Sequence, residues 1–370
     1  MVKVLPYRPE FDEKIKSLCR IPVSGNISLS LEREPNYYTG ACIQANEPSV
    51  FVVYDDDHQR VLAVFNMGTR KTWFEGEIVD VRYLCDLRIH PDKQSGNVLF
   101  IIIKHFGSIA KNERLPAQTI VFGDNHKMIN LIEKRAKKNK GKTDIPYYHF
   151  MGTLVTHMLQ IKAPKIKAER PKGLEIRRAT FSDIEQMQTF FDRESQRINY
   201  YPYYNFKELE KPYYEGLKIE DFFLSFKDNK LCGICGIWNQ TKFKQTRIHG
   251  YSQVYQWIKP LYNLLMWASN KPKLPRSGSI INYLNLHTIL VEGSDPQILR
   301  ELIHTIVNEN AHKGFNHLLC SMCKEDPLID ALDSFHSLRK IKGNYYCVNH
   351  GGSIPNSLKN DFFYLEAARI

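Results

Sequence analysis

The sequence lacks long hydrophobic runs. No stretch of its 370 residues approaches the roughly 20 apolar residues that a membrane-spanning helix needs, and residues 1–6 lack the apolar core of a signal peptide. A Walker-type phosphate loop, a dinucleotide-binding fingerprint and a nucleophile elbow are also absent. We therefore expect a cytoplasmic protein with no membrane partner, and the missing motifs narrow the range of its chemistry.

The eight cysteines do not form the dense frame of a small disulfide-linked protein. They lie in apolar segments, where buried and reduced thiols explain them. Two Cys-x-x-Cys pairs, Cys232 with Cys235 and Cys320 with Cys323, could together supply four thiolates to zinc. Both pairs lie in strand-like runs, where residues three apart point to opposite faces and cannot close on one ion. No metal site is therefore predicted.

The length suits two domains of average size. The net charge of +11 would suit nucleic acid, a membrane surface or a polyanionic cofactor. The densest basic clusters, 134–142 and 162–172, have loop-like sequences that fit a solvated helix end and a linker. Nucleic acid is therefore disfavoured as a partner, and binding through these loops stays open as the weaker alternative.

Residues 161–173 contain two prolines, five basic residues and no sustained period, which is typical of an extended connector. The same order of elements is predicted on either side of it. This gives a first unit at 1–160 and a second unit at 174–370. An additional apolar helix at 253–270 has no counterpart in the first unit.

The expected elements follow from apolar periodicity and turn residues. In the first unit they are strands at 2–6, 49–54, 61–67, from Ile78, 118–122 and 148–160, and helices at 10–19, from Val98 and 125–135. In the second unit they are strands at 174–178, 221–226, 231–238, 280–292, 317–323 and 343–348, helices at 296–310 and 327–338, a helix opened by a capping box of Ser182 and Glu185, and a tail at 362–367 that completes the sheet.

The most informative segment is the apolar strand from Ile78, which ends before His90 and turns through a short polar stretch into the helix at Val98. The first N–H groups of a helix have no partner within it, and the helix dipole adds partial positive charge there. Such a turn can hold a phosphate without dedicated side chains. Gly96 lets the backbone approach a ligand closely.

This segment resembles the acyl-CoA-binding segment of the GNAT acyltransferase superfamily, in which a strand ends in a His-Pro-like turn and runs through Gln/Arg-x-x-Gly-x-Gly/Ala into a helix. The match is incomplete. Counted from Gln94, the two glycine positions hold Asn97 and Leu99; counted from Lys93, Gly96 meets the first position and the second is missed. The repeated order of elements also resembles the tandem GNAT proteins, over nearly the whole chain.

The resemblance implies an α/β protein of two GNAT-like units, each a mixed, mostly antiparallel sheet flanked by helices. It also implies that the first unit binds acetyl-CoA or another acyl-CoA, with the pantetheine arm between the fourth and fifth strands and the pyrophosphate at the turn. Two unrelated α/β domains, or one large domain, are the alternative. The residues that the resemblance assigns to the cofactor are Leu87, Arg88, Ile89, Lys93, Gln94, Ser95, Gly96, Asn97, Val98 and Asn125.

Acyl transfer to an amine needs a base and often an acid. The resemblance points to a carboxylate on or beside the fourth strand, for which Asp80 and Asp86 are available, and Asp86 is the predicted catalytic residue. Where the family has a tyrosine on the helix after the fifth strand this sequence has Ile132, so the usual general acid is missing. We interpret His90 as a turn residue and His287 as an interior histidine.

In the second unit the corresponding turn is reduced to residues 293–296. Asp295 is well placed to cap the following helix and Pro296 to be its first residue. A carboxylate at that position would repel a pyrophosphate, so this turn is degenerate as a cofactor site. The second unit is expected to give structural support and one wall of the acceptor cleft.

The predicted function is direct transfer of an acyl group from acyl-CoA to an amine of a small molecule or a peptide. The alternative is a non-catalytic GNAT-like protein that binds a ligand or a partner through its cleft or through the helix at 253–270. Aromatic clusters at 199–204, 213–214 and 251–257 are expected to pack between helix and sheet, or to line an acceptor pocket between the units.

Overall fold

The same order of secondary-structure elements occurs twice along the chain, as predicted. The computed structural model describes residues 1–23, 25–93, 97–110, 116–138, 146–161, 171–268, 273–349, 354, 356–358 and 363–370. Most of the predicted connector at 161–173 therefore lies outside the described residues, as do the side chains of the basic cluster at 134–142.

The elements have the following bounds. The first pass consists of β1 (Val2–Pro6), α1 (Asp12–Cys19), β3 (Val50–Asp55), β4 (Arg60–Asn66), β6 (Glu77–Ile89), α3 (Val98–Ala110), β7 (Ala117–Phe122), α4 (His126–Lys138) and β8 (Tyr147–Gln160). The second consists of β9 (Leu174–Arg178), α5 (Ile184–Ser195), β10 (Phe222–Lys227), β11 (Lys230–Trp238), β13 (Tyr283–Val291), α7 (Pro296–Asn310), β14 (His317–Cys323), the 3-10 helix η8 (Pro327–Ser334) and β15 (Ser337–Asn349). Outside this repeat lie β2 (Ile27–Glu32), α2 (Tyr37–Gln44), β5 (Thr69–Phe74), β12 (Gln245–Tyr251) and α6 (Gln253–Ala268).

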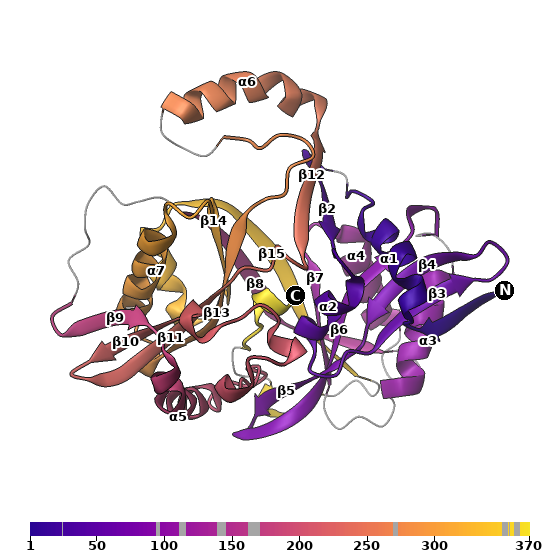
Figure 1. Ribbon diagram of the computed structural model, residues 1–370. Coiled ribbons are helices and arrows are strands. Elements are labelled where there is room, and N and C mark those ends of the chain that lie inside the picture. Colours follow the sequence, from indigo (N-terminus) through magenta and orange to yellow (C-terminus); the bar gives the residue numbers. More distant parts are fainter. Residues whose placement is uncertain are drawn as a thin grey trace.

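The architecture is α/β, as predicted, with helices on both faces of a mixed and mostly antiparallel sheet (Figure 1). The two sheets that were predicted, one for each unit, are joined into a single sheet. Among the described residues, 13 strands form one sheet in the order β1-β3-β4-β6-β7-β15-β8-β14-β13-β11-β10-β9, with β5 attached to β6. Strands β2 and β12 form a separate two-stranded ribbon.

The two halves are joined because each contributes its last strand to the other. Strand β8, from before the connector, pairs antiparallel with β14 from His317↔Gln160 to Cys323↔Leu154. Strand β15, from the end of the chain, pairs with β7 on one side and with β8 on the other. Strands β8 and β15 therefore interlock the halves at the centre of the sheet, and neither half has a complete set of strand partners without the other.

Apolar residues on both faces of the sheet explain where the helices pack. In the first half, Ile102 of α3 lies in the core on one face, and Ile15 of α1 lies in the core on the other. In the second half, Leu302 of α7 and Phe191 of α5 take the corresponding places. The predicted aromatic packing is present for the clusters at 199–204 and 213–214, where Tyr201, Tyr204, Tyr213 and Tyr214 are buried in the core with α5. It is wrong for Trp257 of the cluster at 251–257, which is exposed.

Three local predictions in the second half are wrong. The capping box before α5 is formed by Thr180 and Asp183, two residues earlier than the predicted pair. The helix expected at 327–338 is the 3-10 helix η8, which ends at Ser334 because pairing with β8 begins at Ser337. The tail around 362–367 does not extend the sheet; its described part, 363–370, packs beside β13 and includes only a short 3-10 turn.

Strand β11 pairs with β13, and Gly236 of β11 lies directly opposite His287 of β13. A methyl group there would lie 2.3 Å from Nε2 of His287, whose ring is fully buried among aromatic side chains. We expect Gly236→Ala to reduce the free energy of unfolding by about 2 kcal/mol, because the ring has no room to move. Gly250→Ala in β12 is the matched control, because a methyl group there has no atom within 4 Å. Urea unfolding followed by circular dichroism measures both, and equal losses would contradict this account of the packing.

Candidate active site

Strands β6 and β7 separate from one another partway along their length. They are parallel and pair only at Tyr83↔Gln118 and Leu84↔Thr119, where the Thr119 hydroxyl also donates to the Leu84 carbonyl at 2.8 Å. Beyond this point β6 pairs with β4 alone, and β7 pairs with β15 through Phe122. The facing edges of the two strands therefore diverge and leave an opening in the sheet.

A β-bulge in β6 lies at the point of divergence. Val64 of β4 pairs with Arg88, and Asn66 pairs with Cys85, so two steps along β4 face three steps along β6. Asp86 lies within this bulge. Its φ of 51° is in a region that non-glycine residues seldom adopt. Bulges redirect backbone amides and side chains, and they are frequent beside active sites.

The Asp86 side chain lies between two arginines. It is 7% exposed, and its oxygens accept hydrogen bonds from Arg33 at 3.2 Å and from Arg88 at 3.1 Å. Burial alone would raise the pKa of Asp86, but the two guanidinium groups outweigh it and hold the pKa well below its ordinary value. Asp86 is therefore an ionised and poorly basic carboxylate whose evident role is to neutralise the arginines. Its catalytic role stays a prediction.

Lys244, just before β12, is a titratable group that sequence reasoning missed. Its side chain is only partly exposed, and its ammonium donates a hydrogen bond to the carbonyl of Ile370. Burial, and then the charge of Arg33, lower the pKa of Lys244 to about 7, although Asp86 opposes this shift. No motif marks this lysine in the sequence, because its neighbours at the bulge are more than 150 residues away along the chain.

The predicted cofactor residues fall into three groups. Leu87, Arg88 and Ile89 form the end of β6, beyond its pairing with β7, and Leu87 is 42% exposed although its strand lies inside the sheet. Lys93, Asn97 and Val98 lie between the end of β6 and the first residue of α3. The remaining turn residues, Gln94, Ser95 and Gly96, lie outside the described residues.

Asn125 directly precedes α4, and its side-chain oxygen accepts a hydrogen bond from the amide of Met128 at 3.2 Å. The asparagine therefore caps the helix, which begins one residue later than predicted. Ile132 is 4% exposed and packs in the apolar core of the first half. An apolar residue in that place cannot donate a proton, so α4 offers no general acid at this position.

The second half has a similar opening, between β13 and β14, and the C-terminal tail of the chain fills it. Strand β13 pairs with β14 only over residues 283–285, and two steps along β11 face three along β13 at Thr288, which has a φ of 49°. The tail occupies this site. The Thr288 amide donates to a carboxyl oxygen of Glu366 at 2.9 Å, and Tyr364 donates to the same oxygen at 2.9 Å. The bulge amide of the second half thus binds an oxygen atom of the chain itself.

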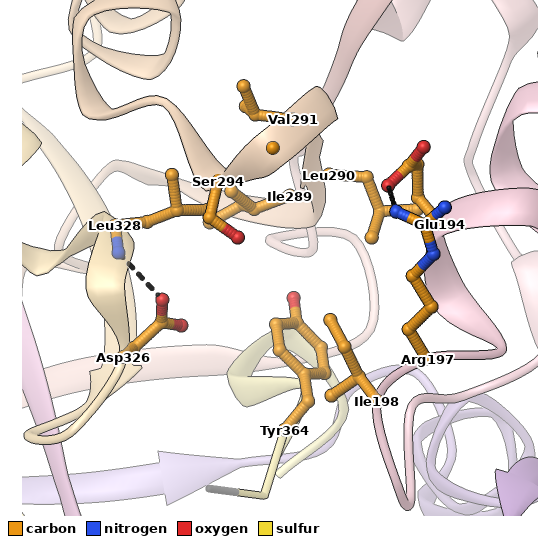
Figure 2. A pocket seen from close by; sticks show the side chains of 11 residues that line it. Glu194, Arg197, Ile198, Ile289, Leu290, Val291, Ser294, Asp326, Leu328 and Tyr364 are labelled. Atoms are coloured by element: carbon orange, nitrogen blue, oxygen red, sulfur yellow. Dashed lines mark hydrogen bonds and ion pairs between the residues drawn. The ribbon is translucent and has the colours of Figure 1, made fainter. Parts of the chain in front are cut away.

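A pocket of about 90 Å³ remains beside this second opening, at the end of β13 (Figure 2). Tyr364 lines it together with two carboxylates, Glu194, which is paired with Arg197 at 3.0 Å, and Asp326. Since a water molecule takes about 30 Å³ of liquid volume, the pocket has room for roughly three waters.

The helix α7 that follows is capped as predicted. Asp295 accepts a hydrogen bond from the amide of Gln297 at 2.8 Å, and Pro296 is the first helical residue. The carboxylate therefore lies at the first turn of α7, where an anion would otherwise bind.

The cysteines and His287 lie in the interior. All eight cysteines are free, and Cys232, Cys235, Cys320 and Cys323 are buried in β11 and β14, with β13 between these strands. Among the described residues no group of three or more His, Cys, Asp or Glu side chains could hold a metal ion. His287 is fully buried, which confirms its interpretation as an interior histidine.

Replacing Asp86 tests its ion pairs. We expect Asp86→Asn to reduce the free energy of unfolding by about 3 kcal/mol, because it leaves two largely buried guanidinium groups without a counter-charge. Asp80→Asn is the matched control in the same strand. Its pair with Lys71 is 3.4 Å long and more than half exposed on both sides, so we expect a loss below about 1 kcal/mol. Denaturant unfolding would contradict the assignment if the two variants lost the same stability.

Comparison with solved structures identifies the fold. The chain is similar to N-myristoyltransferase from Saccharomyces cerevisiae with bound myristoyl-CoA, with a TM-score of 0.59 and 12% identity over 98% of this chain and 85% of that chain. It is also similar to a GCN5-related N-acetyltransferase from Anabaena variabilis, with a TM-score of 0.52 and 11% identity over 93% of this chain and 72% of that chain. No protein-family model and no curated protein matches the sequence. The resemblance predicted from the sequence is thus confirmed at the level of the fold, and the chain has the fold of the GNAT superfamily.

Proposed function

We propose that the protein transfers an acyl group from acyl-CoA to an amine, with the thioester held in the opening between β6 and β7. The observation that carries this proposal is the divergence of the two strands beside the bulge at Asp86. An apolar, partly exposed strand end suits an extended pantetheine arm, which can bond to backbone groups that β7 leaves unpaired. The neighbour with bound myristoyl-CoA supports the choice of ligand class.

The phosphates of the cofactor would lie at the start of α3. Backbone amides at a helix N-terminus attract anions, and the sequence of the turn contributes Lys93 and no acidic residue between it and Val98. Lys93, Gln94, Ser95, Gly96, Asn97 and Val98 are the proposed pyrophosphate site. The second half is proposed not to bind cofactor, because its own cap residue and tail take the corresponding positions.

The bulge of β6 would polarise the thioester carbonyl. The equivalent bulge in β13 supports this role, because its amide at Thr288 already binds an oxygen atom of Glu366. In the first half the carbonyl oxygen of the thioester would take that place. Hydrogen bonds from fixed amides stabilise the negative charge that develops on such an oxygen during attack.

The amine would attack the thioester carbon directly, with no acyl-enzyme intermediate. Cys85 lies at the bulge, but burial raises the pKa of its thiol, so it stays protonated and is a poor nucleophile. The new bond forms between nitrogen and the acyl carbon, the carbon–sulfur bond breaks, and the coenzyme A thiolate leaves. We assign the base that removes the amine proton to Lys244 rather than to Asp86. Lys244 lies close enough to the bulge for its charge to interact with Asp86 and Arg88, and its pKa is lowered toward neutrality, whereas the pKa of Asp86 is held well below its ordinary value.

The acceptor is proposed to be an amine of a small molecule or a peptide. The alternative is a non-catalytic protein of the same fold that binds a ligand or partner, and it is favoured by the incomplete glycine pattern and by Ile132 in place of a tyrosine. Cofactor binding separates the two proposals, because a protein whose opening has lost its ligand gains no stability from acyl-CoA.

Thermal unfolding with acetyl-CoA and with longer acyl-CoAs tests cofactor binding. Ligand at 100 times its Kd should stabilise the fold by about 2.7 kcal/mol, a rise of several degrees in Tm. Gly96→Phe and Lys93→Glu should each remove most of this rise. Lys230→Glu, a matched charge reversal at the start of β11, should retain it. Absence of any rise with the unmodified protein would favour the non-catalytic alternative.

The pH dependence of acyl transfer tests Lys244. Because the pKa of Lys244 is lowered to about 7, its neutral amine becomes populated as pH rises through that value, so kcat/KM should rise with pH and level off above it. Lys244→Met should lower kcat/KM by about a hundredfold or more and remove the inflection. Lys242→Met, at an exposed neighbouring position, should leave both unchanged. An inflection that survives in Lys244→Met would assign the base elsewhere.

A further inference from the structure

Helix α6 stands away from the body of the protein. It begins two residues after the end of β12 and projects from the β2–β12 ribbon (Figure 1, top). None of its residues is buried. At 1.5 Å per residue, its 16 residues span about 24 Å, and it carries Pro260 in its middle. No described helix is long and apolar enough to cross a membrane.

The polar side chains of α6 face the protein. Lys259 donates a hydrogen bond from Nζ to the carbonyl of Pro275 at 2.7 Å. Asn263 accepts one from the amide of Leu274 at 2.8 Å, and Gln256 donates one to the carbonyl of the last β12 residue at 3.0 Å. These polar side chains therefore bind the segments on either side of the helix, the end of β12 and residues 273–279, which we call the supporting segment. A helix packed against a protein core has the opposite arrangement.

The outward face is apolar. Trp257 is 87% exposed, and Val254, Leu261, Leu264 and Trp267 are each more than half exposed. At about 100° per residue these five side chains fall within about 140° of the helix circumference, so they form one continuous face. Contiguous exposed apolar surface of this kind marks a binding surface. We call these five residues the apolar face of α6.

Charge indicates what covers this face. The segment 253–279 contains Lys259, Lys271, Lys273 and Arg276, and no aspartate or glutamate. A second copy of the protein would bring these like charges together. Anionic lipid headgroups complement them, and tryptophans at the boundary between headgroups and acyl chains are typical of helices that lie in the membrane interface.

We propose that α6 docks its apolar face into the surface of an anionic lipid bilayer and lies in the plane of the interface. The exposed Lys273 and Arg276 of the supporting segment then contact lipid phosphates. This interaction does not depend on the proposed acyl transfer. It reverses the expectation of no membrane partner, which was drawn from the lack of long apolar runs: the helix would lie on the bilayer and not cross it.

Co-sedimentation of the full chain with vesicles tests the proposal. We expect retention on vesicles of phosphatidylserine and phosphatidylcholine in equal parts, much weaker retention on phosphatidylcholine alone, and loss of retention at high salt. The triple variant Trp257→Glu, Leu261→Glu, Leu264→Glu should weaken retention by about tenfold or more. Phe181→Glu, which places one such charge at an exposed aromatic residue of the body, should retain binding, and so should the single variant Trp257→Phe. Circular dichroism checks that the variants are folded.

Tryptophan fluorescence gives a second measurement on the unmodified chain. Of the four tryptophans, Trp73 and Trp238 are buried, whereas Trp257 and Trp267 are exposed on α6. A blue shift on addition of the mixed vesicles therefore reports burial of α6. The proposal is overturned if neither vesicle type binds, or if the folded triple variant binds as well as the unmodified chain. It is also overturned if sedimentation velocity shows a dimer that the triple variant dissolves, because a second copy then covers the face.

Discussion

The interlocking of β8 and β15 is the constraint on which the candidate site depends. A strand that leaves its neighbour in a sheet loses hydrogen bonds, and the loss is tolerable when its other edge stays paired. Strand β7 stays paired with β15 along its whole length, from Ala117 to Phe122. Strand β14 stays paired with β8 in the same way. In each half, the strand that diverges is therefore paired along its other edge with a strand of the opposite half. The opening beside β6 is thus part of the fold itself and is present without a ligand.

The two openings have similar backbone conformations, but their side chains differ. Both have a bulge with a residue at positive φ, Asp86 in one and Thr288 in the other. At Thr288 the tail supplies an oxygen atom and aromatic rings, and burial raises the pKa of Glu366, as expected for a carboxyl group taken fully into the interior. At Asp86 the carboxylate stays ionised because two arginines neutralise it. One opening is closed by the chain, and the other is bordered by fixed charges and by a lysine of lowered pKa, which suits a site where a charged intermediate forms.

Sequence patterns predicted the local order of the fold well. Apolar periodicity and the capping residues Asp295 and Pro296 gave most of the described elements in their right places. They could not predict that β15 lies between β7 and β8, because a strand's apolar pattern does not specify its partner. A contiguous segment, 87–98, is where the sequence allowed a site to be proposed, and its role in binding stays a prediction. Arg33 and Lys244 lie near Asp86 but come from distant parts of the chain. The positive φ of Asp86 was not predictable either, because glycine is the residue that usually marks such a conformation in a sequence.

The ribbon of β2 and β12 connects the bulge to α6. Arg33 directly follows β2, and Lys244 directly precedes β12, so β2 ends and β12 begins at the ion-pair cluster around Asp86. Their pairing, reinforced where Arg247 of β12 contacts Glu32 of β2 at 3.0 Å, makes a stiff support. Seven residues of strand reach about 23 Å at 3.3 Å per residue. A bilayer bound at α6 would therefore lie at a fixed distance and orientation from the opening between β6 and β7.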